Sequence, residues 1–359
     1  MLAQTRLNDL DDGPSAEAIA AFRDGMTPFW HPVMEAADLM EDRPSAVRLL
    51  GRRLVIARLD GELVAMPDTC RHFQARLSLG SVVTVAGERA VQCPYHGWAF
   101  GRGGRCVRIP QLAADRKIPK TANLPGYNVA ERYGLIWVDL SGAAEFPIPD
   151  FPEFDDPAFR IVRLREAEPT RTSATRMIMG TLDDTHFPWV HEGILGDRDH
   201  PEPPDHKVWR DDRELVVRYE VEQPPNMITT DMSRPDAAAA GPVRIVYTDH
   251  VGMPAIIRLV KDSDAGRYVI WLASSPVDYD TCANFWIFAR NYDLDPARDT
   301  EYETMSAHVR QQDKPIIESQ RPWLIPPFWT QIEMPMAPGD LPLIEYQKWL
   351  EELKISTAV

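Results

Sequence analysis

Short runs of β-branched and aromatic residues dominate the apolar pattern of the chain. In the first part of the sequence they cover residues 48–59, 62–67 and 127–140. In the second part, apolar and polar residues alternate over 214–222, 243–249, 255–260, 267–273 and 282–291. A period of two is typical of β-strands with one buried face. The pattern therefore predicts two sheet-rich regions.

Helical periodicity is confined to a few segments. It predicts a short helix at 15–24, with Ser15 as its N-cap, and further helices at 174–187, 299–320 and 341–354. The proline- and aromatic-rich segment 146–157 is the best candidate for a domain boundary. We therefore expect an all-β domain at 28–145 and a second domain at 146–359. The helix within residues 1–27 is expected to pack on the second domain.

Composition limits the classes of protein that fit this pattern. The chain has 359 residues, enough for two cores, and its 32 prolines argue against a helical bundle and favour an α+β protein. Its net charge of −15 argues against non-specific binding to nucleic acid or to an anionic membrane. No apolar run approaches the roughly 20 residues of a membrane span, and no export signal is apparent. A cytoplasmic location is predicted.

The strongest chemical signal is a pair of Cys/His motifs. Cys70 and His72 flank a single residue, and Cys93 is followed by Pro-Tyr-His96-Gly-Trp. Two thiolates and two imidazoles could hold a structural zinc ion. They also match a [2Fe–2S] cluster in which two histidines replace two cysteines on one iron, and the single-residue spacing favours this interpretation. Cys106 has no partner at ligand spacing and is expected to be a buried, inert thiol.

A second constellation lies at residues 183–191. Asp183 and His186 are three residues apart and would share one face of a helix, whereas His191 would be rotated away from that face. Pro188 is expected to kink the helix and so to bring both imidazoles to one metal. Two histidines and one carboxylate form the facial triad of oxygen-activating Fe(II) enzymes. The remaining ligand must then come from elsewhere in the chain.

These motifs resemble those of the Rieske non-haem iron oxygenases. The resemblance spans roughly residues 28–354 and includes WHPV at 30–33, ERYGLIWV at 131–138 and YQKWLEEL at 346–353. The branch that it resembles contains caffeine N-demethylases, dicamba and vanillate O-demethylases and saxitoxin-pathway hydroxylases. Three positions depart from the family pattern. Arg71 stands where the family usually has a small residue or proline, Phe73 where it has arginine, and Gly180 where it often has asparagine.

The resemblance implies a site for each of two cofactors. The [2Fe–2S] cluster would be held by Cys70, His72, Cys93 and His96. A mononuclear Fe(II) would be bound by His186, His191 and Asp313, the last of which lies in the family-like segment 311–322. Asp183 would accept hydrogen bonds from His186 and from His96 of a neighbouring subunit in a homotrimer. The second domain would be a helix-grip (START-like) fold, with a curved antiparallel sheet over the iron-bearing helices.

The implied activity is that of an oxygenase. An NAD(P)H-dependent reductase, directly or through a ferredoxin, would supply electrons, and O2 would be used to hydroxylate or oxidatively demethylate a small aromatic or heterocyclic substrate. The sequence does not name that substrate. Asn284, Trp286 and Phe288 would alternate onto one strand face, either in the pocket or in the core. The alternative is a Rieske electron-transfer or ligand-binding protein without a competent mononuclear iron.

The electron donor also has a candidate docking surface. Between Arg71 and Lys120 the chain has nine basic and only two acidic residues, although it is acidic overall. Such a basic segment could steer an acidic donor to the cluster. The same residues could instead offset the charge of the cluster or pair across a subunit contact, and the sequence does not distinguish these roles.

Overall fold

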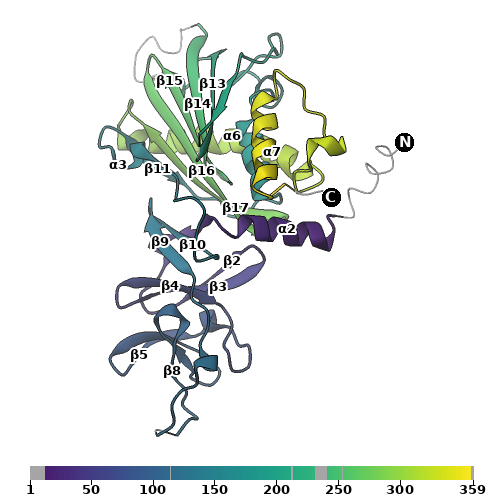
Figure 1. Cartoon of the computed structure of the whole chain (residues 1–359). Helices are drawn as coiled ribbons and strands as arrows, with labels where there is room; N and C mark the ends of the chain where they lie inside the picture. The colour runs from purple at the N-terminus through teal and green to yellow at the C-terminus, as the bar shows by residue number, and fades with distance from the viewer. Residues whose placement is uncertain (1–12, 114, 212, 231–240, 253, 357–359) are drawn as a thin grey trace. The chain divides into compact units, whose positions relative to one another are not determined.

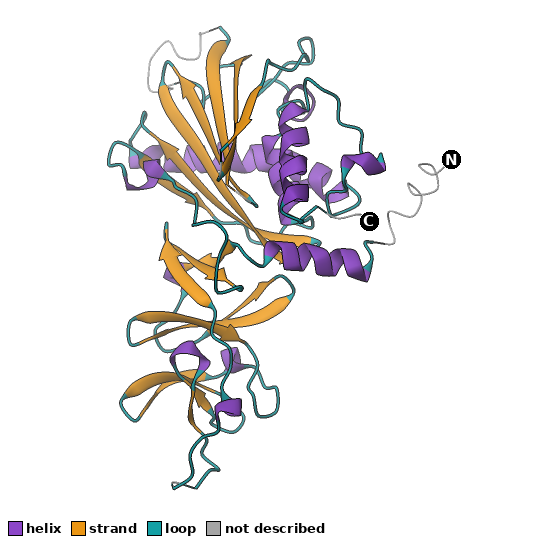
Figure 2. Ribbon diagram, in the orientation of Figure 1, coloured by secondary structure: helices purple, strands orange, loops and turns teal. Residues whose placement is uncertain are grey.

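The computed structural model describes residues 13–113, 115–211, 213–230, 241–252 and 254–356. The chain divides into two compact units. One runs from Thr27 to Pro147, and the other joins the segment up to Met26 to the residues from Ile148 onward. Figure 2 shows that strands dominate the first unit and that the second combines a large sheet with helices. The predicted α+β class is confirmed.

Three small antiparallel sheets build the unit of residues 27–147 (Figure 1). The first contains β1 (Trp30–Glu35), β10 (Leu135–Asp139) and β9 (Asn128–Arg132). The second contains β2 (Ser45–Leu49), β3 (Arg52–Leu59) and β4 (Glu62–Pro67). The third contains β5 (Ser81–Val85), β6 (Glu88–Gln92), β7 (Ala99–Phe100) and β8 (Cys106–Arg108).

Two-residue turns connect several of these strands. Both residues have positive φ in Leu50–Gly51, Asp60–Gly61, Ala86–Gly87 and Tyr133–Gly134. Such turns match the twist of the strands that they join. The first and last of them divide the segments 48–59 and 127–140, which the sequence pattern had presented as single stretches.

The core of this unit includes the cysteines of the two Cys/His motifs. Cys70 and Cys93 are buried in a cluster with Val55, Met66 and Phe100. Cys106 is buried in the same cluster, as predicted. The hydrophobic strands therefore form a rigid base for the two loops that carry the candidate ligands.

A seven-stranded antiparallel sheet forms the centre of the larger unit (Figure 1). Its strand order is β11-β17-β16-β15-β14-β13-β12. The strands are β11 (Arg160–Leu164), β12 (Lys207–Arg210), β13 (Glu214–Gln223), β14 (Val243–Gly252), β15 (Ile256–Ser263), β16 (Gly266–Asp278) and β17 (Thr281–Arg290). The five predicted strands in this region are β13 to β17, whereas the short edge strands β11 and β12 were missed.

The helices of this unit pack on the sheet and on one another. α4 (Ala174–Leu182) contacts β15, β16 and β17, and it also contacts α6 (Asp299–Ser319) and α7 (Leu341–Glu352). α2 (Ala16–Met26) is joined to β16 by the Arg23 guanidinium, which donates to Asp278 at 2.7–2.9 Å. The remaining α-helices, α3 (Pro152–Asp155) and α5 (Phe187–Val190), are single turns. Short 3₁₀ helices cover Ala36–Asp38, Leu77–Leu79, Arg102–Gly104, Lys120–Ala122, Pro296–Arg298 and Phe328–Thr330.

The helix predicted at 174–187 is shorter than expected. Ser173 caps its start by accepting a hydrogen bond from the Arg176 amide at 3.2 Å. It ends at Leu182 because Asp183 has extended backbone angles. Asp183 and His186 therefore do not share a helix face, and Pro188 lies at the start of the separate helix α5 instead of kinking a continuous one.

Candidate metal centres

Two loops of matching geometry carry the first candidate centre. The Cys70 amide donates to the Ala75 carbonyl at 2.8 Å, and the Cys93 amide donates to the Trp98 carbonyl at the same distance. Four residues after each cysteine, Gln74 and Gly97 adopt positive φ and donate back to the cysteine carbonyl. Each motif thus forms a tight turn that starts at its cysteine and presents its histidine.

The candidate ligand atoms in these loops lack protein partners. Cys70 and Cys93 are buried free thiols, and the Nδ1 atoms of His72 and His96 are buried without a hydrogen-bond partner. The two imidazole rings lie 4.6 Å apart. Burial, together with the neighbouring Cys93 thiol, raises the pKa of Cys70 to about 11. Buried polar atoms without partners are costly, and a metal centre bound by two sulfurs and two imidazole nitrogens would satisfy all four groups.

The aromatic environment fixes the orientation of these histidines. Trp98 stacks on His72 with ring centroids 4.8 Å apart, and its indole N–H donates to Gln111 at 3.2 Å. Gln111 in turn donates to the His96 carbonyl at 3.0 Å. Ring stacking and these side-chain hydrogen bonds therefore help to hold both histidines in place.

The second candidate centre joins three segments of the larger unit. The candidate ligand atoms of His186, His191 and Asp313 all lie within 4.8 Å of one another. The Nε2 atoms of the two histidines are 3.2 Å apart, and Asp313 Oδ1 is 2.9 Å from His191 Nε2 and 3.5 Å from His186 Nε2. His186 immediately precedes α5, His191 follows it, and Asp313 lies on α6. Two imidazole nitrogens and one carboxylate oxygen at this spacing suit a divalent metal ion.

Neighbouring groups fix the tautomer of each histidine. His191 is 1% exposed, and its Nδ1 lies 2.9 Å from Oε1 of Gln312. Because a carbonyl oxygen only accepts, this contact places the proton on Nδ1 and leaves the Nε2 lone pair for a metal. His186 Nδ1 lies 3.5 Å from Asp183 Oδ2 and is oriented in the same way. Gln312 was missed in the sequence, although it directly precedes Asp313.

The charges around His186 explain its proton affinity. Burial by itself disfavours the imidazolium, but the carboxylates of Asp183 and Asp313 outweigh burial and raise the pKa of His186 to about 9. Burial would likewise raise the pKa of Asp183 and of Asp313, but their hydrogen bonds with the histidines lower it. The cluster therefore favours positive charge between its carboxylates, which is the electrostatic requirement of a cation site.

The two adjacent aspartates have different partners. Asp183 Oδ1 accepts from the Thr185 amide at 2.8 Å and from its hydroxyl at 2.7 Å, so that Oδ2 remains for His186. Asp184 is buried and lies 3.0 Å from Nε2 of His206. His206 thus has a structural partner in Asp184.

A cavity opens beside the second centre. It has a volume of about 80 Å³, and its wall contains His186, His191 and Asp313. An adjoining hollow of about 400 Å³ shares Trp286 and Arg310 with it. Trp286 and Phe288, candidates from the sequence, line the inner cavity, whereas Asn284 instead donates to Glu166 and Thr170. Another hollow of about 510 Å³ is lined by none of the three candidate ligands.

The fold and the two centres together define a class of protein, a two-domain metalloprotein with a Cys/His centre in one domain and a His/His/Asp centre in the other. Residues 29–128 match the Rieske [2Fe-2S] domain, and residues 171–354 match the vanillate O-demethylase oxygenase C-terminal domain.

Relatives and a solved structure agree with this match. The chain is 35% identical to methylxanthine N1-demethylase NdmA of Pseudomonas putida over 92% of this chain and 90% of that protein. It is 32% identical to methylxanthine N3-demethylase NdmB of the same organism, over 91% of this chain and 89% of that protein. The solved structure of P. putida NdmA with caffeine superposes with a TM-score of 0.78 at 34% identity, covering 93% of this chain and 92% of that one.

The chain belongs to the Rieske non-haem iron oxygenases, as the resemblance had implied. It is an oxidoreductase that uses O2 and works with a reductase, and its cofactors are a [2Fe–2S] cluster and a mononuclear iron. These findings support the oxygenase interpretation and not the alternative of an electron carrier without mononuclear iron. In the part of the chain that the structure describes, no helix is both long and apolar enough to cross a membrane.

Proposed function

We propose that this oxygenase removes a methyl group from nitrogen or oxygen of a small ring substrate. The observation that carries the proposal is the inner cavity, which places a largely apolar wall directly beside His186, His191 and Asp313. The relatives that match over most of their length are named N-demethylases of methylxanthines, and this supports the same reaction type. A flat apolar molecule suits such a wall because burying its surface is favourable.

In this proposal each candidate residue has one task. Cys70, His72, Cys93 and His96 hold the cluster, and their free thiols and unpaired Nδ1 atoms support that assignment. His186, His191 and Asp313 hold the mononuclear iron. When bound, this iron supplies O2-dependent hydroxylation of the methyl group, whose product then releases formaldehyde.

The chain's own side chains prepare the site for that chemistry. Gln312 and Asp183 face the Nδ1 atoms of the two histidines and so direct their Nε2 atoms toward the metal position. Phe187 and Ile317 help to exclude water from the cavity. Where the cavity meets the adjoining hollow of about 400 Å³, Glu166 accepts hydrogen bonds from Arg310 at 2.7 Å and from the Trp286 indole at 2.9 Å. These three side chains form the passage through which a substrate would enter.

Electron supply in this proposal requires a second subunit. Asp183 keeps 25% of its side chain exposed, so that an imidazole of another chain can reach it. On the cluster side, Phe73 and Tyr95 are 66% and 63% exposed, and their rings lie 4.1 Å from His72 and 3.8 Å from His96. Exposed aromatic residues are typical of binding surfaces. We assign His96 and Asp183 to the contact between subunits of a homotrimer.

The domain boundaries and the cellular setting belong to the same proposal. Residues 28–145 form the Rieske domain and residues 146–359 the catalytic domain, with the N-terminal helix added to the latter. Four free cysteines fit the reducing cytoplasm, where an NAD(P)H-dependent reductase, with or without a ferredoxin, would supply electrons.

Product analysis tests the proposed reaction. Purified full-length protein, with a surrogate reductase and NADH, is supplied with N-methylated heterocycles and methoxy-substituted aromatics. We expect formaldehyde and the demethylated ring in equal amounts for at least one compound, and neither product from Asp313→Ala. A hydroxylated ring that keeps its methyl group, formed without formaldehyde, would contradict demethylation.

A further inference from the structure

Lys261 is a buried lysine in the wall of the catalytic cavity. It lies on β15, is 4% exposed, and lines the same cavity as His186, His191 and Asp313. Leu259 and Ile270 also belong to this wall, most of which is apolar. An ammonium group is expensive to bury unless it is paired, and its presence in such a wall calls for a partner.

The described residues do not supply that partner. Among the described residues, no carboxylate lies within 4.0 Å of the Lys261 ammonium, and its one close polar contact is the Tyr247 ring, with Nζ 5.0 Å from the ring centroid. The ring face of a tyrosine attracts a cation but leaves other N–H donors of the ammonium unused. The other cation of the cavity, Arg310, differs because Glu166 already pairs with it at 2.7 Å.

Among the described residues, the buried acid that acts electrostatically on Lys261 makes no ion pair with it. Asp249 lies on the neighbouring strand β14, and both of its carboxyl oxygens are buried without a hydrogen bond. Burial, reinforced by Asp184, raises the pKa of Asp249 well above its usual range and so favours the neutral acid. Burial lowers the pKa of Lys261 to about 8, and the charge of Asp249 opposes this shift. The cavity wall therefore holds a buried amine that no carboxylate of the described residues contacts within 4.0 Å.

We propose that Lys261 binds and orients an anionic oxygen of the substrate, so that the enzyme acts on small methylated ring compounds that carry a carboxylate or a similar oxyanion. A carboxylate would accept hydrogen bonds from the unused donors of the ammonium and balance its charge in a dry cavity. This inference rests on the proposed demethylase function and specifies its substrate class. Lys261 is a specificity-determining residue in this account, because it selects the orientation of the ring without taking part in the reaction.

Equilibrium binding of a matched pair of probes tests this inference. Calorimetry on the full-length, cluster-containing protein compares 3-methoxybenzoate with 3-methoxybenzamide, which has nearly the same shape but no charge. We expect the benzoate to bind at least tenfold more tightly than the amide. Lys261→Met should abolish this preference while leaving the affinity for the amide within about twofold. Lys348→Met, which removes a lysine from the surface of α7, should leave the preference intact.

A structural role for Lys261 gives a different pattern. If the amine only compensates Asp249, then Lys261→Met leaves the benzoate preference unchanged, and this result would overturn the inference. Asp249→Asn removes the buried acid and should maintain or increase the preference, so loss of the preference in that variant also counts against it. If Lys261→Met does not fold, the affinities of the unaltered protein and of Lys261→Gln for the two probes still test the inference. Equal affinities for the two probes in the unaltered protein would refute the inference.

The probe experiment is independent of the test of the proposed function. Binding requires no electrons, no reductase and no turnover, whereas demethylation requires all three. Formaldehyde production from neutral methylated rings, combined with equal affinities for the two probes, would keep the demethylase function and reject the role of Lys261. A tenfold benzoate preference without any demethylation would support the role of Lys261 and reject the demethylase function.

Discussion

At the scale of single residues, the orientation of His191 depends on Gln312. The amide oxygen of Gln312 lies 2.9 Å from His191 Nδ1, and the next residue in α6 is the candidate ligand Asp313. One turn of helix thus supplies both a candidate ligand and the group that orients a second candidate ligand. Loss of such an orienting partner typically weakens metal binding by about 10–100-fold.

Gln312→Leu should therefore lower the affinity of the mononuclear site for Fe(II) by about 10–100-fold while the cluster remains intact. Iron titration of the metal-depleted site, together with the visible spectrum of the cluster, measures both quantities. Gln311→Leu is the matched control, since Gln311 is exposed on the same helix. Equal iron affinities in the two variants would show that Gln312 does not orient the ligand.

Asp183 offers a separate prediction, because its carboxylate faces a candidate ligand without being one. Asp183→Asn keeps the shape of the side chain but removes the charge that lies 3.5 Å from His186 Nδ1. We expect both metals and normal reduction of the cluster, but reoxidation with substrate and O2 at least about tenfold slower. Rapid-mixing absorbance of the reduced protein follows this directly. Reoxidation at the parental rate would show that Asp183 does not connect His186 to His96 of a neighbouring subunit. Asp184 would then be the next residue to test.

At the scale of secondary structure, α6 is anchored where it begins. Arg290 on β17 is buried and donates to Asp299 at 2.7 Å, while Arg160 on β11 donates to the same carboxylate. Arg290 also lies over the Tyr302 ring, with 4.0 Å between the guanidinium carbon and the ring centroid. These contacts fix the first turn of the helix that carries Asp313 to two strands of the sheet.

Asp299→Asn should lower the free energy of unfolding by about 2 kcal/mol at pH 7, because it leaves the buried Arg290 without its counter-ion. Burial alone would raise the pKa of Asp299, but hydrogen bonds from Arg160 and Arg290 outweigh burial and lower it. A carboxyl group with a lowered folded-state pKa stabilises the protein above its unfolded-state pKa and loses this effect as the pH falls. The difference between variant and parent should therefore shrink below about pH 4.

Urea unfolding at several pH values measures this difference. Glu301→Gln removes the same charge from the same helical turn, but its ion pair with Arg298 is on the surface, so we expect a change of no more than about 0.5 kcal/mol. A pH-independent destabilisation by Asp299→Asn would mean that side-chain packing, and not charge, anchors the helix.

The part of the site that could be predicted from the sequence is the part in which the candidate ligands lie close together along the chain. The Cys/His loops are local motifs whose spacing indicated a metal. The pair His186 and His191 is also local, but its interpretation as metal ligands depended on the Cys/His motifs elsewhere in the chain. Asp313 followed only from the family resemblance, because 122 positions separate it from His191 and the packing of α6 on α4 brings them together. The helix predicted through His186 was wrong because local periodicity gave no sign of the extended backbone at Asp183.

Lys261 was missed for a different reason. Residues 257, 259 and 261 share one face of β15, and a lysine in the inward register of an otherwise apolar face was a usable signal. The sequence could not show that this face borders the iron ligands, because that depends on how the sheet packs against α4 and α6. Sequence patterns specify which face of a strand is buried, but not what it is buried against.

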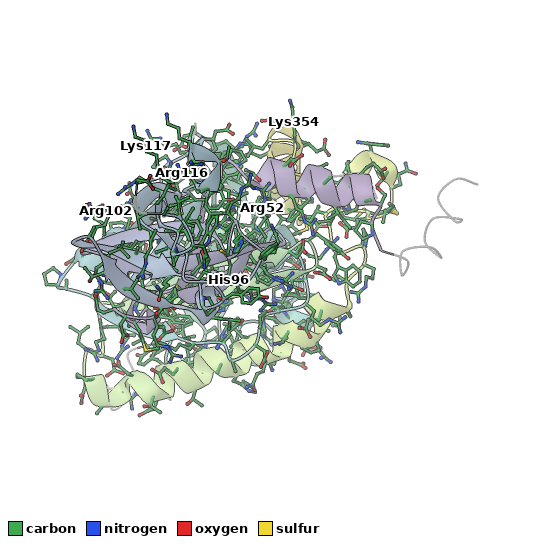
Figure 3. The ribbon with its side chains drawn as sticks, turned by 90° about the horizontal axis from the view of Figure 1, so that it is seen from below. Arg52, His96, Arg102, Arg116, Lys117 and Lys354 are labelled. Atoms are coloured by element: carbon green, nitrogen blue, oxygen red, sulfur yellow. The ribbon has the colours of Figure 1, made fainter. Side chains whose placement is uncertain are left out.

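At the scale of the whole molecule, the basic segment between Arg71 and Lys120 bears on the electron donor. Several of its members already have acidic partners, including Arg102 with Glu62 and Arg105 with Glu88. Arg116 and Lys117 are exposed and have no ion pair among the described residues. Figure 3 shows Arg102, Arg116 and Lys117 toward the same side of the view, with His96 nearer its middle.

The double variant Arg116→Glu/Lys117→Glu should slow reductase-coupled turnover several-fold at low salt, and the difference from the parent should fade at high salt because ions screen the attraction. Steady-state turnover across a salt series measures both effects. Lys207→Glu, which reverses an exposed charge in the other unit, should leave the rate near that of the parent. A salt-independent rate in the unaltered protein would rule out steering by this surface.

We propose that one chain holds two distinct iron centres, one at the Cys/His loops and the other at His186, His191 and Asp313. Iron and acid-labile sulfide content per chain tests it most directly, for the purified protein and for Asp313→Ala. We expect about three irons and two sulfides in the unaltered protein, and about two irons and two sulfides in the variant, with an unchanged cluster spectrum. About two irons in both proteins, or the same iron content with and without Asp313, would contradict it.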